Sequence, residues 1–421
     1  MTDRIIKNYS QIATTPLRKK LLAIDEAGLA AIETRAAILQ NVKVDNNRLI
    51  IKDQEYDLSL YKTLKVIGFG KASCKAAEAL EEVLGTLIQT GIAIGIGPTA
   101  CELIKTYQGT HPQPSYENVA ISEQILEICK NATAEDLVIV VVSGGGSALL
   151  CWPKTECDQS QILYHQFLKT GGTIKEMNTI RKHISLLKGG GLAKFLYPAT
   201  VASLIFSDIP GDDFKMIASG PTYFDETTVS DAEQILTKYN LTKFDLVETP
   251  KDRKYFEKIT NIPLVTNSLA LQAMAQKARD LGLTPQIASG EIYDEAPKLL
   301  ALMREKLQSK TAVLAGGEPK MKVSKGNGSG GRNLYVGLHA LATLSDQECF
   351  LALASDGLDN SDAAGAIVDA QTLQKAHALG VDVADAIEEF DGYGLFKKLD
   401  ELIFTGPTEA NVSDLFILLK E

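Results

Sequence analysis

The chain has 421 residues, of which 45% are hydrophobic and 23% charged, a globular composition with enough length for two or three domains. Its net charge of -10 argues against non-specific binding of nucleic acid, which needs a clustered positive surface. The six cysteines show no metal-ligand spacing, and this fits a reducing compartment. The polar N-terminus lacks the apolar core of a signal peptide, and no apolar run could span a bilayer. We therefore expect a cytoplasmic protein that binds neither membranes nor nucleic acid.

The first predicted elements are helices, followed by a strand with a glycine turn. Apolar residues recur at helical spacing from residue 15 to about residue 42, which predicts one or two amphipathic helices. A strand at residues 65–67 then ends at Gly68-Phe69-Gly70-Lys71, and an alanine-rich helix follows at residues 72–84. This order of strand, glycine turn and helix is the repeating unit of a doubly wound sheet.

Two more strands repeat this pattern. Residues 136–142 and 200–206 are continuous apolar runs, typical of strands that are covered on both faces. The first ends at Ser143-Gly144-Gly145-Gly146-Ser147, and the second at an acidic turn that begins with Ser207-Asp208. Between the two strands, residues 169–196 are predicted to be helical, with a break at three glycines.

The pattern becomes charged and loses its period around residues 247–260, so we place a domain boundary after residue 250. Beyond it, short strands are predicted to alternate with helices, with strands at 263–265, 285–288, 311–315 and 349–354 and helices at 269–281, 295–308 and 334–344. The simplest architecture is two α/β domains. Ligands of open parallel sheets bind beyond the carboxyl ends of the strands, where the glycine-rich loops lie, so we expect the site between the domains.

The first two glycine-rich loops can bind anions. Gly68-Phe69-Gly70 lets the backbone approach a phosphate or carboxylate, a helix N-terminus lies behind it, and Lys71 adds positive charge. A tight turn with a surface lysine explains this loop equally well. The loop Ser143-Gly144-Gly145-Gly146-Ser147 exposes several N–H groups directly after a buried strand, which favours phosphate or carboxylate binding over a flexible linker.

Other candidate residues are amides, cations and acids. Asn178 and Arg181 share one helical face at a spacing of three residues, although a charge run is usually a solvated face. Asp208 and Asp356 each follow a buried strand, and Mg²⁺ is usually held by one or two carboxylates together with phosphates. An Asp- and Gly-rich turn has the same composition.

The C-terminal half supplies the strongest set of loops. Gly316-Gly317-Glu318 follows a predicted strand and is a candidate cofactor-binding loop. Arg332 follows a glycine-rich stretch at residues 326–331, where a guanidinium group can stabilise charge on a transferring phosphoryl group.

These motifs resemble the MOFRL-type glycerate 2-kinases, and they follow the family's order along nearly the whole chain. The matching blocks are residues 68–73, 111–114, 143–150, 176–183, 207–221, 316–333, 355–369 and 405–414. The resemblance implies an α/β fold with a Rossmann-like domain of mostly parallel sheet over residues 1–250. It also implies a smaller C-terminal α/β domain of MOFRL type over residues 251–421, with the active site in the cleft between the domains. The implied reaction is ATP-dependent phosphorylation of glycerate at its 2-hydroxyl, which gives 2-phosphoglycerate and ADP, with Mg²⁺.

The resemblance also implies roles for single residues. Lys71 and Arg332 match the family's lysine and arginine and would clamp the transferring phosphoryl group. Asp208 would serve as base or metal contact, and Asp356 as a metal ligand. The ATP-binding residues would be Ser143, Gly144, Gly145, Gly146, Ser147, Gly316, Gly317 and Glu318, and the substrate-binding residues Asn178 and Arg181. The chain departs from the family's pattern at Gly191, Leu334-Tyr335 and Glu409-Ala410, which leaves the identity of the acceptor open.

Three alternatives remain: a kinase for a related sugar acid, a nicotinamide-dependent reductase, and a non-catalytic sensor of sugar acids or nucleotides. The loop Gly68-Phe69-Gly70-Lys71 lacks the third glycine of the GxGxxG fingerprint, which argues against the reductase. We expect the partners to be small molecules, and a homodimer is one assembly to test.

Overall fold

The computed structural model describes residues 4–211, 213–322, 328–408 and 410–421. The chain forms two compact units. Unit 1 comprises residues 1–33, 208–212 and 266–421, and unit 2 comprises residues 34–207 and 213–265. The N-terminal segment thus packs with the C-terminal part of the chain. The domain boundary expected after residue 250 stays a prediction.

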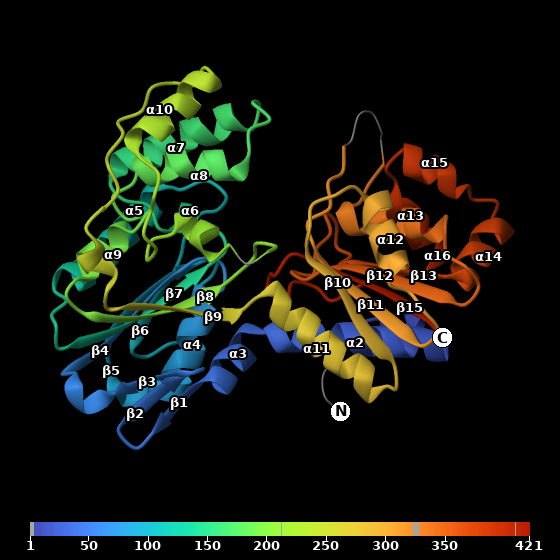
Figure 1. The fold of residues 1–421 in the computed structure, drawn as a ribbon, viewed down its shortest axis with the longest axis horizontal. Helices are drawn as coiled ribbons and strands as arrows, with labels where there is room; N and C mark the ends of the chain where they lie inside the picture. The colour runs from blue at the N-terminus through green and yellow to red at the C-terminus, as the bar shows by residue number, and fades with distance from the viewer. Residues whose placement is uncertain (1–3, 212, 323–327, 409) are drawn as a thin grey trace. The chain divides into compact units, whose positions relative to one another are not determined.

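Unit 2 is built on a parallel sheet with the strand order β6-β5-β4-β7-β8-β9 (Figure 1). Its strands are β4 (Thr63–Phe69), β5 (Ile88–Gly95), β6 (Ile104–Gln108), β7 (Asp136–Ser143), β8 (Thr200–Phe206) and β9 (Ile259–Val265). The central strand β7 is buried along its whole length, because its apolar side chains are covered on both faces of the sheet. This sheet confirms the predicted α/β class and the parallel arrangement.

The helices of unit 2 cover this sheet, and a small antiparallel sheet precedes it in the chain (Figure 1). The helices are α3 (Thr34–Asn41), α4 (Ser73–Leu84), α5 (Tyr116–Lys130), α6 (Gly146–Leu149), α7 (Lys154–Phe167), α8 (Ile174–His183), α9 (Gly191–Leu196) and α10 (Val229–Lys238); the small sheet contains β1 (Val42–Asp45), β2 (Arg48–Ile51) and β3 (Gln54–Asp57). Thr173 and Glu176 form a capping box that fixes where α8 begins. The predicted break before α9 lies at Gly189 and Gly190, which adopt positive φ angles of 54° and 86°.

Unit 1 contains a mixed sheet with the strand order β10-β11-β15-β12-β13-β14. Its strands are β10 (Thr284–Ile292), β11 (Thr311–Gly317), β12 (Glu348–Ala354), β13 (Gly365–Asp369), β14 (Leu402–Ile403) and β15 (Asp414–Lys420). The strands β10 and β11 pair in parallel, whereas β15 runs antiparallel to both β11 and β12. The last strand of the chain therefore lies in the middle of the sheet.

The helices of unit 1 lie on both faces of this sheet (Figure 1). They are α1 (Tyr9–Ile12), α2 (Pro16–Ile32), α11 (Asn267–Asp280), α12 (Ala296–Glu305), α13 (Arg332–Leu341), α14 (Ala370–Ala378), α15 (Val383–Glu388) and α16 (Gly392–Leu399). Helices α2 and α11 approach closely at Gly28, where an added Cβ would lie 2.7 Å from Met274 Cγ.

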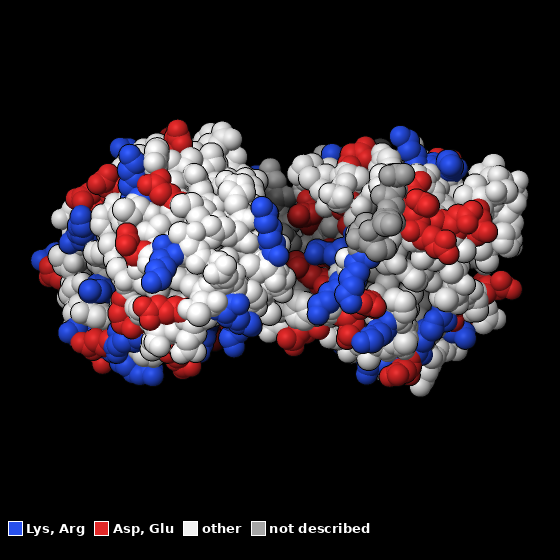
Figure 2. Space-filling view, turned by 90° about the horizontal axis from the view of Figure 1, so that it is seen from above, with Lys and Arg blue, Asp and Glu red and all other residues white. Residues whose placement is uncertain are grey.

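Within the described ranges, no helix is both long and apolar enough to cross a bilayer. On the face of the molecule in Figure 2, the described Lys and Arg side chains are interspersed with Asp and Glu.

A buried ion cluster joins α2 to strands that follow it by about 350 residues in the chain. Arg18 is 1% exposed, and its Nε and Nη2 atoms donate to the two carboxylate oxygens of Asp369 at 2.7 and 2.8 Å. Its Nη1 atom donates to Glu401, which also accepts a hydrogen bond from Lys375. Bidentate pairing of this kind holds a guanidinium group in one orientation. The cluster is one reason why the N-terminal segment packs in unit 1.

Replacement of Arg18 should destabilise unit 1. Arg18→Leu leaves the carboxylates of Asp369 and Glu401 buried without their main partner, so we expect the free energy of unfolding to fall by about 3 kcal/mol. Denaturant unfolding followed by circular dichroism measures this change. Lys298→Ala is the control, because its pair with Asp294 is exposed, and it should cause no measurable change. Equal stability of Arg18→Leu and the parent protein would show that the ion cluster does not stabilise unit 1.

Candidate active site

The carboxyl ends of β4 and β7 carry two glycine-rich loops that touch each other. Lys71 N donates to Gly144 O at 2.8 Å, and Ala72 N donates to Ser143 Oγ at 3.1 Å. Gly70 has a φ of 120°, and a Cβ there would lie 2.1 Å from Ser143 Oγ, so a larger residue does not fit. The first two predicted loops thus form one surface at this edge of the sheet.

Two cations and an imidazole gather beside these loops. A Cβ at Gly145 would lie 3.1 Å from both Lys71 Cγ and His111 Cδ2, so these two side chains flank the glycine. Although the His111 ring reaches solvent, burial against neighbouring atoms and the charges of Lys71 and Arg181 lower its pKa to about 4. Burial lowers the pKa of Arg181 to about 10, which still leaves it charged at neutral pH.

Within the described parts of the chain, Lys71 and Arg181 lack a carboxylate counter-ion. Among the residues that the structure describes, no carboxylate forms an ion pair with Lys71 or Arg181, whereas the neighbouring Lys182 pairs with Asp225. Together with a neutral His111, they leave two positive charges near a loop rich in N–H groups. Such a cluster suits a bound carboxylate or phosphate.

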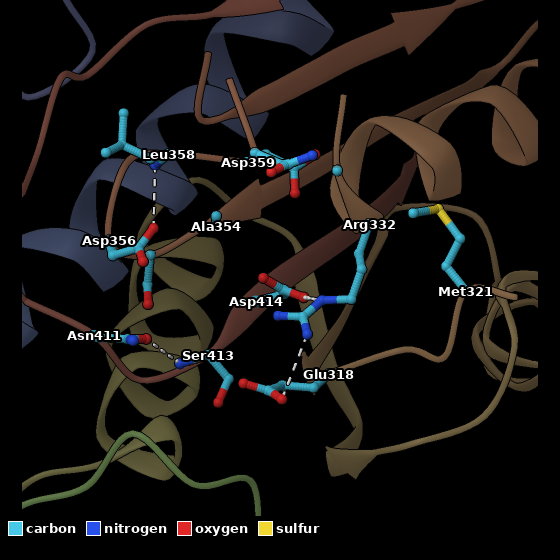
Figure 3. Close-up of a pocket in the computed structure, with 13 residues that line it drawn as sticks. Glu318, Met321, Arg332, Ala354, Asp356, Leu358, Asp359, Asn411, Ser413 and Asp414 are labelled. Atoms are coloured by element: carbon cyan, nitrogen blue, oxygen red, sulfur yellow. Dashed lines mark hydrogen bonds and ion pairs between the residues drawn. The ribbon is translucent and has the colours of Figure 1, made fainter. Parts of the chain in front are cut away.

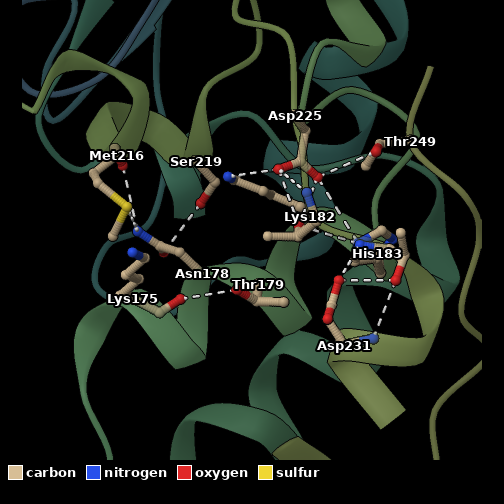
Figure 4. Close-up of polar contacts among 12 residues, drawn as sticks. Lys175, Asn178, Thr179, Lys182, His183, Met216, Ser219, Asp225, Asp231 and Thr249 are labelled. Carbon is tan, nitrogen blue, oxygen red and sulfur yellow. Dashed lines mark hydrogen bonds and ion pairs between the residues drawn. The ribbon is translucent and has the colours of Figure 1, made fainter. Parts of the chain in front are cut away.

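The side chain of Asn178 connects Arg181 to the second glycine-rich loop through Ser219, and Figure 4 shows the contact between Asn178 and Ser219. Arg181 Nη1 donates to Asn178 Oδ1 at 3.3 Å, and Ser219 Oγ donates to the same oxygen at 3.2 Å. Ser219 Oγ lies 2.8 Å from Ser147 Oγ, while Asn178 Nδ2 donates to Met216 O at 3.4 Å. The predicted substrate residues Asn178 and Arg181 therefore lie in one network with Ser147.

Sequence analysis assigned no role to Ser219. It lies in a stretch of three consecutive left-handed residues, Ala218, Ser219 and Gly220, with φ angles of 50°, 60° and 63°. Left-handed geometry costs about 1–3 kcal/mol for a non-glycine residue and often occurs at functional sites. These dihedral angles are visible only in the structure.

A second polar cluster fixes the end of α8 (Figure 4). Asp225 accepts hydrogen bonds from Lys182 Nζ at 3.0 Å and from Thr249 Oγ1 at 3.1 Å. Burial alone would raise the pKa of Asp225, but the charge and hydrogen bond of Lys182 hold it below its usual value. His183 is fully buried, and its Nδ1 lies 2.9 Å from Val247 O.

Unit 1 has its own pocket, with a volume of about 310 Å³ (Figure 3). Its lining includes the predicted residues Glu318, Arg332 and Asp356. Ser413 also lines the pocket and donates to the backbone oxygen of Asp208 at 2.8 Å, so the Asp208 loop adjoins this site.

Arg332 is held in the pocket by two carboxylates (Figure 3). Its Nε donates to Asp414 Oδ2 at 3.1 Å, and its Nη1 lies 3.5 Å from Glu318 Oε2. Burial raises the pKa of Asp414 to about 7, against the opposing effect of Arg332. Asn333 Nδ2 donates to the other oxygen of Asp414 at 2.8 Å. Asp414 lies in a matching block of the sequence, but no role was predicted for it.

Asp359 holds the first turn of α13, which begins at Arg332. It accepts hydrogen bonds from Asn333 N at 3.1 Å and Leu334 N at 2.8 Å. A carboxylate in this position satisfies N–H groups that have no partner within the helix. A Cβ at Gly331 would lie 2.3 Å from Asp359 Oδ1, so this glycine is required by the cap.

The acids near this pocket can be tested as a metal site. Among the described residues, no three His, Cys, Asp or Glu side chains are arranged to hold a metal ion. A Mg²⁺ ion that binds with nucleotide phosphates needs only one or two carboxylates. Asp356 lines the pocket, and the backbone oxygen of Asp208 is bonded to Ser413 beside it, so metal binding by these two carboxylates stays a prediction.

The glycines of the loop at residues 316–318 have a packing function. A Cβ at Gly316 would lie 2.3 Å from Asn267 Oδ1, and one at Gly317 would lie 2.4 Å from Ile292 N. These contacts explain both glycines without a ligand. Their assignment to ATP stays a prediction.

The departures from the family's pattern lie mostly in packed positions. A Cβ at Gly191 would lie 2.1 Å from Leu186 O, so this backbone excludes any larger residue at the position. Leu334 is fully buried in the core, and the Tyr335 ring stacks on Phe390 with the centroids 5.1 Å apart. Glu409 lies outside the described residues, as do Asp212, Gly326 and Asn327 of the motif blocks.

Comparisons with known proteins agree with this geometry. Residues 20–249 match the model of a domain of unknown function, DUF4147, and residues 311–414 match the MOFRL family. A glycerate 2-kinase of Pyrococcus horikoshii is 32% identical, with 93% of this chain and 94% of the relative covered. A D-glycerate 2-kinase of Thermotoga maritima is 34% identical, with 84% and 89% covered.

A solved structure extends the similarity to the fold. The crystal structure of a Thermotoga maritima glycerate kinase superposes with a TM-score of 0.85 at 29% identity, covering 96% of this chain and 99% of that one. The expected Rossmann-like and MOFRL-type architecture is confirmed. The chain belongs to the MOFRL-type glycerate kinase family and is a kinase.

Proposed function

We propose that this kinase transfers the γ-phosphoryl group of ATP to the 2-hydroxyl of glycerate, giving 2-phosphoglycerate and ADP. The observation that carries the proposal is the pair of cations Lys71 and Arg181 around a neutral His111 in unit 2, with no described carboxylate paired to either cation. The names of the relatives support glycerate as the acceptor.

In unit 2, Arg181 would bind the carboxylate of the hydroxy acid. Its fork of donors matches a carboxylate, and Asn178 Oδ1 already orients the guanidinium group. Lys71 and the N–H groups of residues 143–147 would bind a phosphate. In this arrangement, acid and phosphate lie on one surface, and positioning supplies much of the catalysis.

In unit 1, the pocket would bind the nucleotide as its Mg²⁺ complex. Four acids, Glu318, Asp356, Asp359 and Asp414, line it with Arg332, so bare phosphates would be repelled. Asp356 and Asp208 would hold Mg²⁺, which neutralises phosphate charge when bound.

Phosphoryl transfer needs charge stabilisation and one proton acceptor. The substrate oxygen forms a bond to the γ-phosphorus, the bond to ADP breaks, and the hydroxyl proton leaves. We propose that Asp208 accepts this proton and that Lys71 and Arg332 stabilise the charge on the equatorial oxygens.

The cytoplasmic location and the homodimer also stay proposals.

Loss of the positive charge of Lys71 or of Arg332 should abolish most activity. Lys71→Ala and Arg332→Gln should each lower kcat by at least about a hundredfold, because each removes charge that stabilises the transition state. A coupled assay of ADP release with glycerate and Mg²⁺ measures this loss, with Lys194→Ala on the exposed side of α9 as control. Melting temperatures confirm that the variants fold. No ADP release from the parent protein across a panel of hydroxy acids would reject the kinase reaction proposed here, and NADH oxidation with a 2-oxo acid would favour the reductase.

The Arg181 prediction separates acid binding from ATP binding. Arg181→Lys keeps the charge but loses the fork, so KM for glycerate should rise about tenfold, by the free energy of one charge-assisted hydrogen bond. KM for ATP should stay unchanged. A parallel rise of both KM values would contradict a role on the acid alone.

The lowered pKa of His111 predicts a pH effect on stability. Between pH 6.5, the ordinary pKa of histidine, and about pH 4, the unfolded chain takes up a proton that the folded protein does not. The free energy of unfolding therefore decreases as the pH is lowered through this window. His111→Gln should reduce the fall by about 1 kcal/mol, a value discounted because the ring reaches solvent. Denaturant unfolding at several pH values measures it, with the exposed His165→Gln as control. Identical pH profiles for His111→Gln and the parent would contradict the shift.

A further inference from the structure

The hydrogen-bonded chain through Ser219 assigns a direction to each proton in it. Its members are Arg181, Asn178, Ser219 and Ser147, all within unit 2. Asn178 and Ser219 are 3% and 0% exposed, so water does not offer them alternative partners. Ser147 is half-buried and lies at the end of the chain.

The orientation of the Asn178 amide is fixed from two sides. The guanidinium group of Arg181 has only donors, so the atom of Asn178 that faces it is the oxygen. Met216 O has only lone pairs, so the atom that faces it is the amide nitrogen, at 3.4 Å. Both neighbours require the same assignment.

This orientation determines the two hydroxyl protons. Because Asn178 Oδ1 can only accept, the Ser219 hydroxyl donates its single proton to it, at 3.2 Å. Ser219 then has only lone pairs left for Ser147, 2.8 Å away, so Ser147 donates its own proton to Ser219. Ser147 therefore presents lone pairs alone to any ligand, and no other side-chain donor contacts it within the described residues.

We infer that, in the complex before phosphoryl transfer, Ser147 Oγ accepts a hydrogen bond from the hydroxyl next to the carboxylate of the substrate, and that Ser219 is the positioning residue that makes it an acceptor. This inference rests on the proposed function, since it deepens the choice of substrate. A 2-hydroxy acid can donate to Ser147, whereas the corresponding 2-oxo acid places a second acceptor against it. The site thereby selects the hydroxy acid over its oxo analogue.

The strained backbone around Ser219 serves this arrangement. The left-handed φ of 60° at Ser219 is accompanied by a hydrogen bond from Gly189 N to its carbonyl oxygen, at 2.9 Å. A Cβ at Gly146 would lie 2.6 Å from Ala218 Cβ, so the Ser219 loop packs against the loop that carries Ser147. The two hydroxyl groups are thus held together by backbone packing as well as by their own hydrogen bond.

The test compares the binding of glycerate and of its 2-oxo analogue, hydroxypyruvate, to the full-length protein by calorimetry. The parent should bind glycerate about tenfold tighter, the value of one unmatched hydrogen-bonding pair. Ser219→Ala frees the proton of Ser147 to turn toward the ligand, so hydroxypyruvate should bind tighter and the ratio should fall about fivefold. Ser147→Ala should weaken the binding of glycerate and leave the affinity for hydroxypyruvate unchanged.

These opposite changes in affinity distinguish this role from a purely structural one, because a structural defect would weaken the binding of both acids together. Ser203→Ala is the matched control, because Ser203 is also fully buried and pairs with a hydroxyl, that of Thr222 at 3.2 Å, in the middle of the sheet. Its ratio should equal that of the parent. The inference would be overturned if the ratio of the two affinities did not change in Ser219→Ala, or if this variant lost equal affinity for both acids.

Failure of the proposed function gives a different result. If glycerate binds with the expected ratios but no ADP forms, the kinase proposal is wrong for this acid and the role of Ser219 stands. If ADP forms and the ratio does not change in Ser219→Ala, the inference is wrong and the kinase proposal stands. If neither acid binds to the parent protein, both are overturned.

Discussion

A charge that leaves water must be paired or neutralised, and this constraint explains most of the polar interior of the chain. Arg18 is paired with Asp369 and Glu401, and Lys188 with Glu156. Asp25 has no hydrogen-bond partner within the described residues, and burial raises its pKa to about 8, which keeps it neutral at pH 7. Against this background, Lys71 and Arg181 stand out, because no carboxylate among the described residues pairs with either of them.

The same constraint gives the two proposed binding sites, one in each unit, different charge environments. In unit 2, no carboxylate among the described residues pairs with Lys71 or Arg181, whereas in unit 1 Arg332 is surrounded by acids. A carboxylate suits the first environment and a metal-bound nucleotide suits the second. Each environment is set by a few side chains on loops, which explains how one α/β scaffold can bind such different ligands.

Much of the fold follows from the sequence because buried parallel strands have a strong local signal. The strand β8 has the predicted bounds, and β7 and α4 differ from prediction by one residue at one end. The antiparallel β1–β3 sheet was missed because its strands have only four residues each, which is too short for a clear periodic signal. The central place of β15 was also missed, since strand order depends on contacts between distant residues.

For the candidate site, the loops could be predicted but not the partners that orient their side chains. The proximity of Lys71 to Ser143–Gly144 follows from the pairing of neighbouring strands, which the glycine patterns indicated. The buried Asp414 behind Arg332 and the Ser219 behind Asn178 depend on tertiary contacts that no local pattern encodes. Gly316 shows the converse, because its signal in the sequence has a sufficient cause in packing against Asn267.

The central position of β15 has a consequence for synthesis of the protein. Unit 2 contains only residues between 34 and 265, so all of its strands can pair while later residues are still being added. In unit 1, β11 and β12 have no direct pairing and meet through residues 414–420, so its sheet cannot close until that strand has left the ribosome. Helix α2, which packs on β12 and β15, is made long before either strand and can reach its final place only after both have been made. A nascent chain would thus hold a finished unit 2 between two unfinished ends, which are exposed to chaperones until release.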